Sequence, residues 1–250
     1  MIHSALYREP VLLDSALHRN KKMAVLSDYA ITRAMHAVFL SATEFAQAAL
    51  EFAIVFVNSG ERDVGGRMLM SPIVLLGLAQ GENLLVDGTR WDARYVPAFI
   101  RRYPFLTANL KGASNPGVLI DAAWSGFSET EGAALFEADG KPAPALVNAV
   151  KFLELFEAEA QRTRAFCQRL IELDVLKEMK ADATLAGGAT FSVDGFYTVD
   201  EDKLLALPEE GVIELHRNGM LMLLHLHLLS LANLKLLVER KTRRPAVPAG

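Results

Sequence analysis

The sequence is poor in cysteine and has no excess of positive charge, and each shortage excludes a class of protein. Cys167 is the single cysteine among 250 residues, so no internal disulfide can staple the fold. Acidic residues outnumber basic ones, 30 to 26, and the formal net charge is -4. Nucleic-acid binding relies on a clustered positive field, so we expect no nucleic-acid partner. The first ten residues contain no unbroken apolar run, so we also expect no secretory signal peptide and a cytoplasmic location.

Motifs that signal common chemistries are missing too. There is no Gly-x-Gly-x-x-Gly loop after a predicted strand, no Walker-type lysine loop and no Gly-x-Ser-x-Gly elbow. Cys167 lies within a predicted helix and has no histidine nearby in sequence. We therefore interpret this thiol as a structural residue, not a nucleophile. The sequence thus offers no catalytic residue.

The histidines near the C-terminus lack the spacing of a metal site. His225 and His227 are two residues apart, which places their side chains about 200° apart on a helix. His216 could join them only through tertiary packing. Histidines of a core or of a subunit contact are therefore favoured over ligands, and we predict neither a metal nor a cofactor. The carboxylates of the predicted long helix, such as Glu154 and Glu157, lie opposite its apolar face and are interpreted as solvated.

The sequence does contain enough apolar residues for one sizeable core. Hydrophobic residues make up 51% of the chain and charged residues 22%, which is typical of a globular protein. No linker separates the periodic segments, so we predict one compact domain over 1–240 and a flexible tail over 241–250. The predicted fold class is α+β, with a mostly antiparallel sheet packed against a long central helix and a C-terminal helical region.

Local signals indicate where the main elements lie. Ser41 and Glu44 form a Ser-x-x-Glu capping box at the start of a helix that ends near Phe52. Pro144 opens the longest helix, which the apolar spacing predicts to reach about residue 174. Pro72, inside a predicted strand, indicates a bulge or a sheet edge. Further predicted elements are an antiparallel meander over 53–57, 68–77 and 84–87, a strand over 190–199, a left-handed Gly219 and a helix over 220–240.

The last helix is apolar over about the length of a membrane span. Polar groups are costly at bilayer depth, and this segment holds His225, His227, Ser230, Asn233 and Lys235. We therefore predict a helix buried on most sides in a soluble core, and no membrane span. Because its apolar surface exceeds the needs of one face, a homo-oligomer formed through this helix is also predicted. The basic residues at its end suit either a polyanion or the negative end of the helix dipole; they are Lys235, Arg240, Lys241, Arg243 and Arg244.

Aromatic and basic residues are concentrated between positions 91 and 105. Both types dominate binding hot spots, because they supply large contact areas, guanidinium forks and stacking. The candidate binding residues are Trp91, Arg94, Tyr95, Arg101, Arg102, Tyr103 and Phe105. The competing interpretation is a short helix whose aromatic side chains belong to the core and whose arginines are solvated.

Several segments of the chain resemble the SapC family of bacterial proteins. They include Glu51–Val57, Leu75–Leu78 with Gly81–Asn83, and above all Tyr95–Phe105, the run YVPAFIRRYPF. The similarity extends over about residues 35–235 in the family's order. The resemblance implies an association with bacterial surface-layer loci and with neighbouring halogenase-like and cupin-like proteins. It implies no catalytic residue set.

These observations are consistent with three functions. We favour a cytoplasmic binding or accessory protein that recognises a protein or peptide partner, because the aromatic and arginine cluster has no accompanying catalytic spacing. The resemblance also allows an enzyme of peptide modification that acts with a halogenase-like or cupin-like neighbour. Such an enzyme should gather polar groups around Arg101, Glu82 or His225 in a closed pocket. A surface-layer-associated component is the third possibility.

Overall fold

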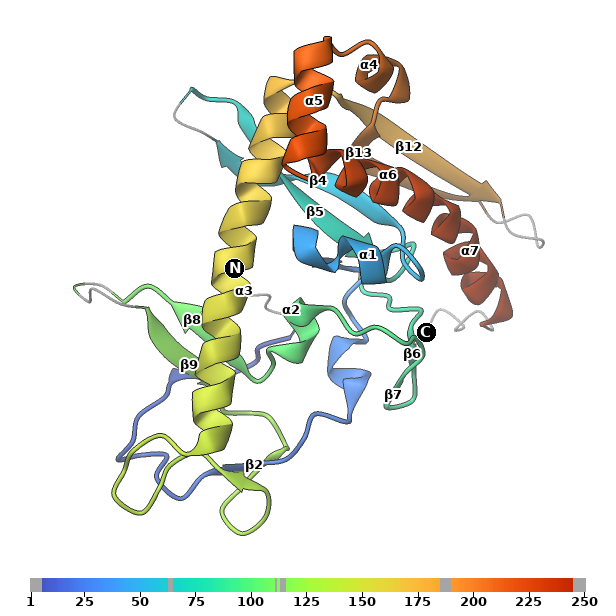
Figure 1. Cartoon of the computed structure of the whole chain (residues 1–250). Coiled ribbons are helices and arrows are strands. Elements are labelled where there is room, and N and C mark those ends of the chain that lie inside the picture. Colours follow the sequence, from blue (N-terminus) through green and yellow to red (C-terminus); the bar gives the residue numbers. More distant parts are fainter. Residues whose placement is uncertain (1–5, 63–64, 111, 113–115, 185–189, 245–250) are drawn as a thin grey trace.

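Antiparallel sheets and one long helix organise the chain (Figure 1). The structure, a computed structural model, describes residues 6–62, 65–110, 112, 116–184 and 190–244. The predicted α+β class is confirmed, and the elements form one compact domain. The flexible tail was expected over 241–250. Residues 241–243 belong instead to helix α7 (Leu234–Arg243), and residues 245–250 lie outside the described part of the chain.

The largest sheet has five strands, all antiparallel, in the order β12-β13-β4-β5-β3. Their bounds are Ala37–Phe39 (β3), Ile54–Arg62 (β4), Met68–Leu75 (β5), Leu176–Thr184 (β12) and Thr190–Val199 (β13). β-branched and aromatic residues favour β4 and β5, and Ile54, Phe56 and Val74 are fully buried in the main core. The strands predicted over 53–57, 68–77 and 190–199 are therefore confirmed.

Two local predictions need correction. The segment expected as the third strand of the meander does not join the large sheet. Instead Val86–Asp87 (β6) pairs with Arg90–Trp91 (β7), because Gly88, at φ 61°, turns the chain straight back. The helix after the capping box is present but shorter than predicted, as a 3-10 turn η2 (Ala42–Glu44) followed by α1 (Phe45–Ala48).

Helix α3 (Pro144–Glu172) matches the predicted long helix and serves two cores. Near its start, Leu146 and Leu153 pack into a cluster with residues of two small sheets. Further along, Phe156, Phe166 and Leu170 belong to the main core. The small sheets are β1 (Pro10–Leu12), β9 (Gly117–Asp121) and β8 (Phe105–Ala108), and β10 (Phe127–Ser128), β2 (Lys22–Met23) and β11 (Ala133–Ala134). The remaining short helices are η1 (Tyr29–Thr32) and α2 (Ala98–Arg101).

The C-terminal helices follow β13, and α6 packs against β13 and β4 of the large sheet (Figure 1). They are α4 (Glu201–Leu205), α5 (Glu209–Arg217), α6 (Met220–Ser230), the 3-10 turn η3 (Leu231–Asn233) and α7. Gly219, at φ 78°, adopts the left-handed conformation that the sequence predicts between α5 and α6.

Polar side chains anchor α6 and η3 to the backbone below them. His227 is buried and joins two strands: its Nε2 accepts from Val199 N (3.1 Å) and its Nδ1 lies 2.9 Å from the Ile54 carbonyl. Because a backbone N–H occupies Nε2, the proton is on Nδ1, which donates to that carbonyl. Ser230 Oγ accepts from Ile54 N (2.9 Å), and Asn233 Nδ2 donates to Ala49 O (2.8 Å). One face of the helix is thus fixed to the sheet.

The opposite face of this helix is open, which corrects the expectation of burial on most sides. Met220–Arg243 is the one helix in the described ranges that is long and apolar enough to cross a membrane, with a mean hydropathy of 1.7 over its most apolar window, of which 22% is buried. The three polar anchors face the fold, and Met222, Leu229 and Leu236 are exposed on the other side of the helix. His216 and His225 are exposed whereas His227 is buried.

Candidate binding groove

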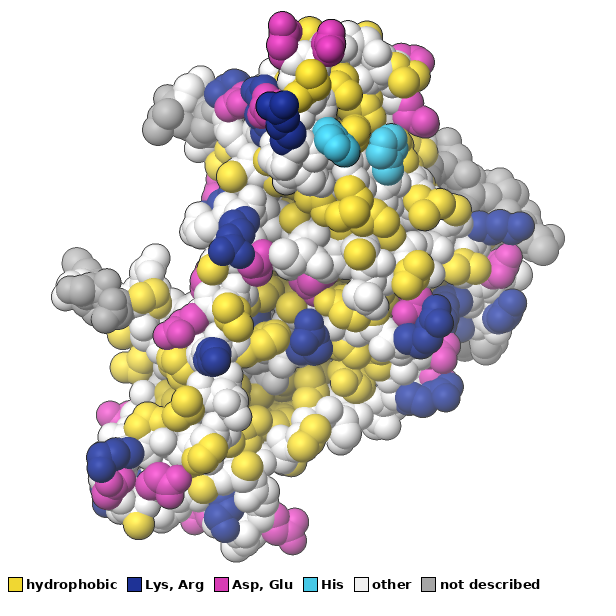
Figure 2. Space-filling view, in the orientation of Figure 1, with side chains coloured by type: hydrophobic (Ala, Val, Ile, Leu, Met, Phe, Trp, Pro, Cys, Tyr) yellow, Lys and Arg dark blue, Asp and Glu magenta, His cyan; other side chains and the backbone are white. Residues whose placement is uncertain are grey.

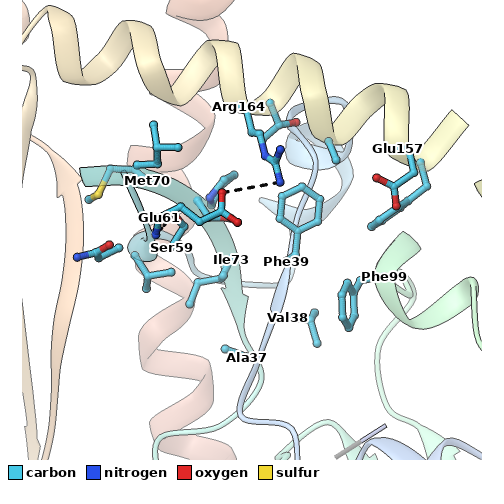
Figure 3. A pocket seen from close by; sticks show the side chains of 18 of the residues that line it. Ala37, Val38, Phe39, Ser59, Glu61, Met70, Ile73, Phe99, Glu157 and Arg164 are labelled. Carbon is cyan, nitrogen blue, oxygen red and sulfur yellow. Dashed lines mark hydrogen bonds and ion pairs between the residues drawn. The ribbon is translucent and has the colours of Figure 1, made fainter. Parts of the chain in front are cut away.

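A cavity of about 300 Å³ lies between α3 and the edge of β5. Such a volume is at the lower end of the range for ligand pockets in proteins, about 300–1,000 Å³. We call it the α3–β5 groove. In Figure 3, α3 crosses above the groove and Phe39 lies between Arg164 and Phe99. The lining comes from β3, β4, β5, the end of α2 and the middle of α3.

Three phenylalanines and an arginine form one end of the groove. The Phe39 ring packs edge-on against Phe156, with centroids 5.8 Å apart, and Phe99 contacts the same ring at 6.4 Å. The Arg102 guanidinium lies over Phe99 at 4.2 Å and over Phe156 at 4.8 Å. Cation–π contacts of this kind hold a charged group against aromatic faces. This end of the groove therefore offers a rigid aromatic surface to an apolar group.

Backbone groups of β5 face the groove where β3 ends. Strand β3 pairs with β5 only over Ile73–Leu75, and Leu40 N adds one last hydrogen bond to the Pro72 carbonyl (3.0 Å). Backbone groups alternate between the two sides of a strand, so Met70 presents its N–H and C=O on the same side as Pro72. Among the described residues, no strand pairs with that side of Met68–Ser71. The groove therefore runs between α3 and an edge of β5 with which no described strand pairs.

The predicted edge at Pro72 is confirmed, and its position has a physical cause. Pro72 has no N–H to donate, so the ladder between β3 and β5 cannot continue regularly past it. The chain then leaves the sheet, and Ala42 N donates to Thr163 Oγ1 on α3 (2.9 Å). That bond ties the start of η2 to α3 at the groove.

Charged side chains around the groove balance one another. Arg164 and Glu61 face each other at 4.0 Å across its rim, and both are more than half exposed. Exposed pairs at this distance contribute little and can separate. Glu157 accepts a hydrogen bond from Thr107 Oγ1 (2.9 Å). With Arg102 the groove carries two acidic and two basic residues, so it has no strong preference for a charged ligand.

Of the seven predicted binding residues, Arg102 lines the groove. It is buried, with 4% of its surface exposed, and besides the two phenylalanines it lies 5.9 Å from the Tyr7 ring. Tyr7 donates to the Phe105 carbonyl (2.8 Å), and burial raises the pKa of Tyr7 to about 12. Arg102 therefore belongs to the wall of the groove and to the core behind it.

Three other predicted binding residues are core residues. Trp91, Tyr103 and Phe105 are each less than 10% exposed. Tyr103 donates to Asp121 Oδ2 (2.7 Å), and burial, followed by this hydrogen bond, raises the pKa of Tyr103 well above its usual value. Trp91 Nε1 donates to the Tyr95 carbonyl (2.8 Å). These aromatic side chains therefore belong to the core, as the competing interpretation of the segment expects.

The remaining three predicted binding residues, Tyr95, Arg101 and Arg94, lie near Glu44 and Glu51. Tyr95 donates through its hydroxyl to Glu44 Oε1 (2.7 Å), and burial, then this bond, raises the pKa of Tyr95. Arg101 lies over the Tyr95 ring at 5.7 Å and is largely exposed. Arg94 pairs with Glu51 at 3.7 Å and is also exposed. These two arginines lie outside the lining of the groove.

Sequence reasoning missed most of the groove. Phe39, Met70 and Phe156 line it, yet each reads as an ordinary core residue in its own segment. Pro72 carried the single usable signal, because a proline inside a strand indicates an edge.

A family model described as SapC matches residues 13–237. The chain belongs to the SapC family. The resemblance seen in the sequence is therefore confirmed, and every residue that lines the α3–β5 groove lies within the matched region. Neither a curated protein nor a solved structure matches the chain.

The reactive groups of this SapC-family chain are shielded or dispersed. Cys167 is buried, and desolvation raises the pKa of its thiol to about 12, so no thiolate forms near neutral pH. Within the described ranges no group of three or more His, Cys, Asp and Glu side chains could hold a metal ion. Arg101, Glu82 and His225, around which an enzyme pocket was considered, do not line the groove.

A second cavity, about 420 Å³, lies beside α7 and is also charge-balanced. Arg240 pairs with Asp92 and holds the pKa of that carboxyl below its usual value. Lys241 pairs with Glu82, and Arg244 donates to the Asn83 and Val86 carbonyls. The basic end of the helix is therefore directed toward the loop after β5, and its charges are largely neutralised there.

Proposed function

We propose that this SapC-family protein is a binding protein that holds an extended, uncharged segment of a partner polypeptide in the α3–β5 groove. The observation that carries the proposal is the position of the groove beside the part of β5 that no described strand pairs with. A strand edge offers unpaired N–H and C=O groups to another chain. Added strands are a recurrent way of binding peptides.

The hydrogen-bonding geometry supports a strand in line with β3. Met70 presents its N–H and C=O toward the groove, two residues before the Pro72 carbonyl that accepts from Leu40. A peptide that continues the line of β3 can exchange both bonds with Met70. Alternate side chains of a strand point to opposite faces. Every second side chain of the peptide would therefore contact Phe39 and Phe156 at the aromatic end.

The lining supports an apolar and uncharged segment. Apolar side chains from β3, β5 and α3 form most of the wall, and the acidic and basic residues cancel in number. Burying an unpaired charge costs several kcal/mol. A cationic side chain entering the groove would be repelled by Arg102, and an anionic one would be repelled by Glu157 and Glu61.

Selection from a phage-displayed library of random peptides tests this proposal. Peptides enriched on the immobilised full chain should carry apolar residues at alternate positions and few charges. Ala160→Phe fills the groove from α3, whereas Ala158→Phe adds the same ring at an exposed position of the same helix. We expect Ala160→Phe to weaken binding of the selected peptides about tenfold or more, equivalent to roughly 1.4 kcal/mol, and Ala158→Phe to leave it unchanged.

A chemical variant of the peptide separates strand addition from simple pocket filling. Methylation of alternate backbone nitrogens removes the donors that face Met70 and preserves the side chains. Binding should then be lost, because one edge of the added strand can no longer pair. Peptides that bind Ala160→Phe and Ala158→Phe equally well would refute the proposal. So would a library from which no peptide is enriched.

A further inference from the structure

Glu44 is a buried carboxylate that ties η2 to the start of α2. Only 6% of its surface is exposed. Its Oε2 accepts hydrogen bonds from the Ser41 N–H (3.0 Å) and the Ser41 hydroxyl (2.7 Å). Its Oε1 accepts from the Tyr95 hydroxyl and from the Ala98 N–H, both at 2.7 Å. Hydrogen bonds to a carboxylate are stronger than those between neutral groups, so this link is a firm one.

The bond to Ala98 N holds the helix that carries part of the groove. Helix α2 has four residues, too few to be stable without tertiary contacts. Its first N–H groups have no acceptor within the helix, and Glu44 supplies one for Ala98. Phe99 is the next residue, and Arg102 N donates to the Ala98 carbonyl (3.0 Å). Phe99 and Arg102 both line the α3–β5 groove at its aromatic end.

The outer side of α2 is exposed, so its position depends on contacts on the inner side and at its start. Arg101 is exposed and lies over the Tyr95 and Phe152 rings, at 5.7 and 5.3 Å. Figure 2 shows a basic side chain among hydrophobic ones over this helix. Phe99 and Ile100 are buried on the inner side. Apolar packing therefore holds α2 from within, and a carboxylate holds its first residue.

The turn η2 is also bound to α3. Ala42 N donates to Thr163 Oγ1 (2.9 Å), and Thr163 is a buried residue of the groove lining. The turn thus contacts α3 through Ala42 and α2 through Glu44, and the aromatic end of the groove is formed by residues of these two helices and Phe39.

We propose that Glu44 is a positioning residue, which fixes α2 relative to α3 and so determines how tightly the aromatic end of the groove holds a side chain of the bound segment. The effect on binding rests on the function proposed above. The effect on α2 does not.

A second glutamate offers the same chemistry without the link to the groove. Glu51 accepts from the N–H groups of Arg94 (2.8 Å) and Tyr95 (3.1 Å). These two residues do not line the groove and lie before Pro97, ahead of α2. Glu51→Gln is therefore the matched control for Glu44→Gln.

Amide hydrogen exchange of the full chain tests the positioning role without a ligand. A glutamine has one acceptor oxygen, so in either orientation the bond to Ala98 is lost or loses the assistance of the charge. Exchange in residues 98–102 should rise about tenfold more than exchange in β4 in Glu44→Gln, and less than about twofold more in Glu51→Gln.

Ser41→Ala provides a milder variant that keeps the carboxylate. It removes one of the bonds that orient Glu44 and should speed exchange in residues 98–102 about threefold relative to β4. Unchanged exchange of this segment in both Glu44→Gln and Ser41→Ala, or an equal rise in β4, would overturn the proposal.

Glycine scanning of a peptide selected on the groove tests the consequence for binding. Glu44→Gln should weaken binding of the peptide about tenfold, and Glu51→Gln less than about twofold. On Glu44→Gln, glycine at the one peptide position that contacts the aromatic end should cost little further affinity, whereas glycine elsewhere should cost as much as on the wild type. Equal changes at every position would indicate a general loosening of the fold and contradict the proposal. A wild type that binds no peptide refutes the function proposed for the groove, and the exchange rates then decide the role of Glu44 by themselves.

Discussion

Lowering the pH should destabilise this protein through His227. The buried imidazole accepts a hydrogen bond at Nε2 from Val199 N and donates from Nδ1 to the Ile54 carbonyl. A second proton would have to enter at Nε2, where it would meet the Val199 N–H instead of an acceptor. Burial is the main cause that lowers the pKa of His227 from 6.5 to about 4.

The size of the effect follows from the two pKa values. Above pH 6.5 the imidazole is neutral in both the folded and the unfolded chain, so its contribution is fully present. Between pH 6.5 and about 4 the unfolded chain takes up a proton that the folded chain excludes, and stability falls with pH. The loss amounts to about 2 kcal/mol at pH 5 and approaches about 3 kcal/mol below pH 4.

Urea unfolding of three proteins at about pH 7.5 and about pH 5 isolates this contribution. His227→Gln keeps a donor and an acceptor but cannot titrate. His225→Gln is the control, because His225 is exposed on the same helix. The free energy of unfolding of the wild type and of His225→Gln should fall by about 2 kcal/mol more than that of His227→Gln over this range. An equal fall in all three proteins would refute the reasoning.

Two further predictions concern buried groups. Glu44 accepts four hydrogen bonds, so Glu44→Ala should lower the free energy of unfolding by roughly 3 kcal/mol or more, while Glu154→Ala on the exposed side of α3 should change it by less than about 0.5 kcal/mol; equal urea midpoints would contradict this. Cys167 should not react with a thiol reagent such as Ellman's reagent in the native chain and should react fully in denaturant, because it is buried and its pKa is about 12. Rapid colour in native buffer would contradict that prediction.

Elements with strong local patterns could be predicted from the sequence. The three-to-four spacing of apolar residues after Pro144 gave α3 almost in full, and Ile54–Val57 forms a strand because β-branched and aromatic side chains pack well on a sheet. Strand β12 was missed. Its start, with Lys177, Glu178 and Lys180 exposed, does not resemble a strand. It forms because β13 offers a partner at the sheet edge, where charged residues are favourable.

The candidate site could be predicted only in part. Composition pointed to the stretch between residues 91 and 105, and Arg102 does line the groove. Trp91 and Tyr103, however, are buried in the core, and aromatic residues suit a core as well as a binding surface. The groove itself arises where β5 and α3 face each other. Their residues, Met70 and Phe156 for example, are far apart in sequence, so no local pattern reveals the cavity.

The groove lies where α3 passes from one hydrophobic cluster to the other. Leu153 is the last buried helix residue in the cluster with the small sheets, and Phe156, one turn later, is the first buried one in the main core. Phe156 also lines the groove. A peptide bound in the groove would therefore contact α3 at the boundary between the two clusters. A bound segment should therefore restrict movement of the two clusters relative to each other and slow amide hydrogen exchange at both ends of α3.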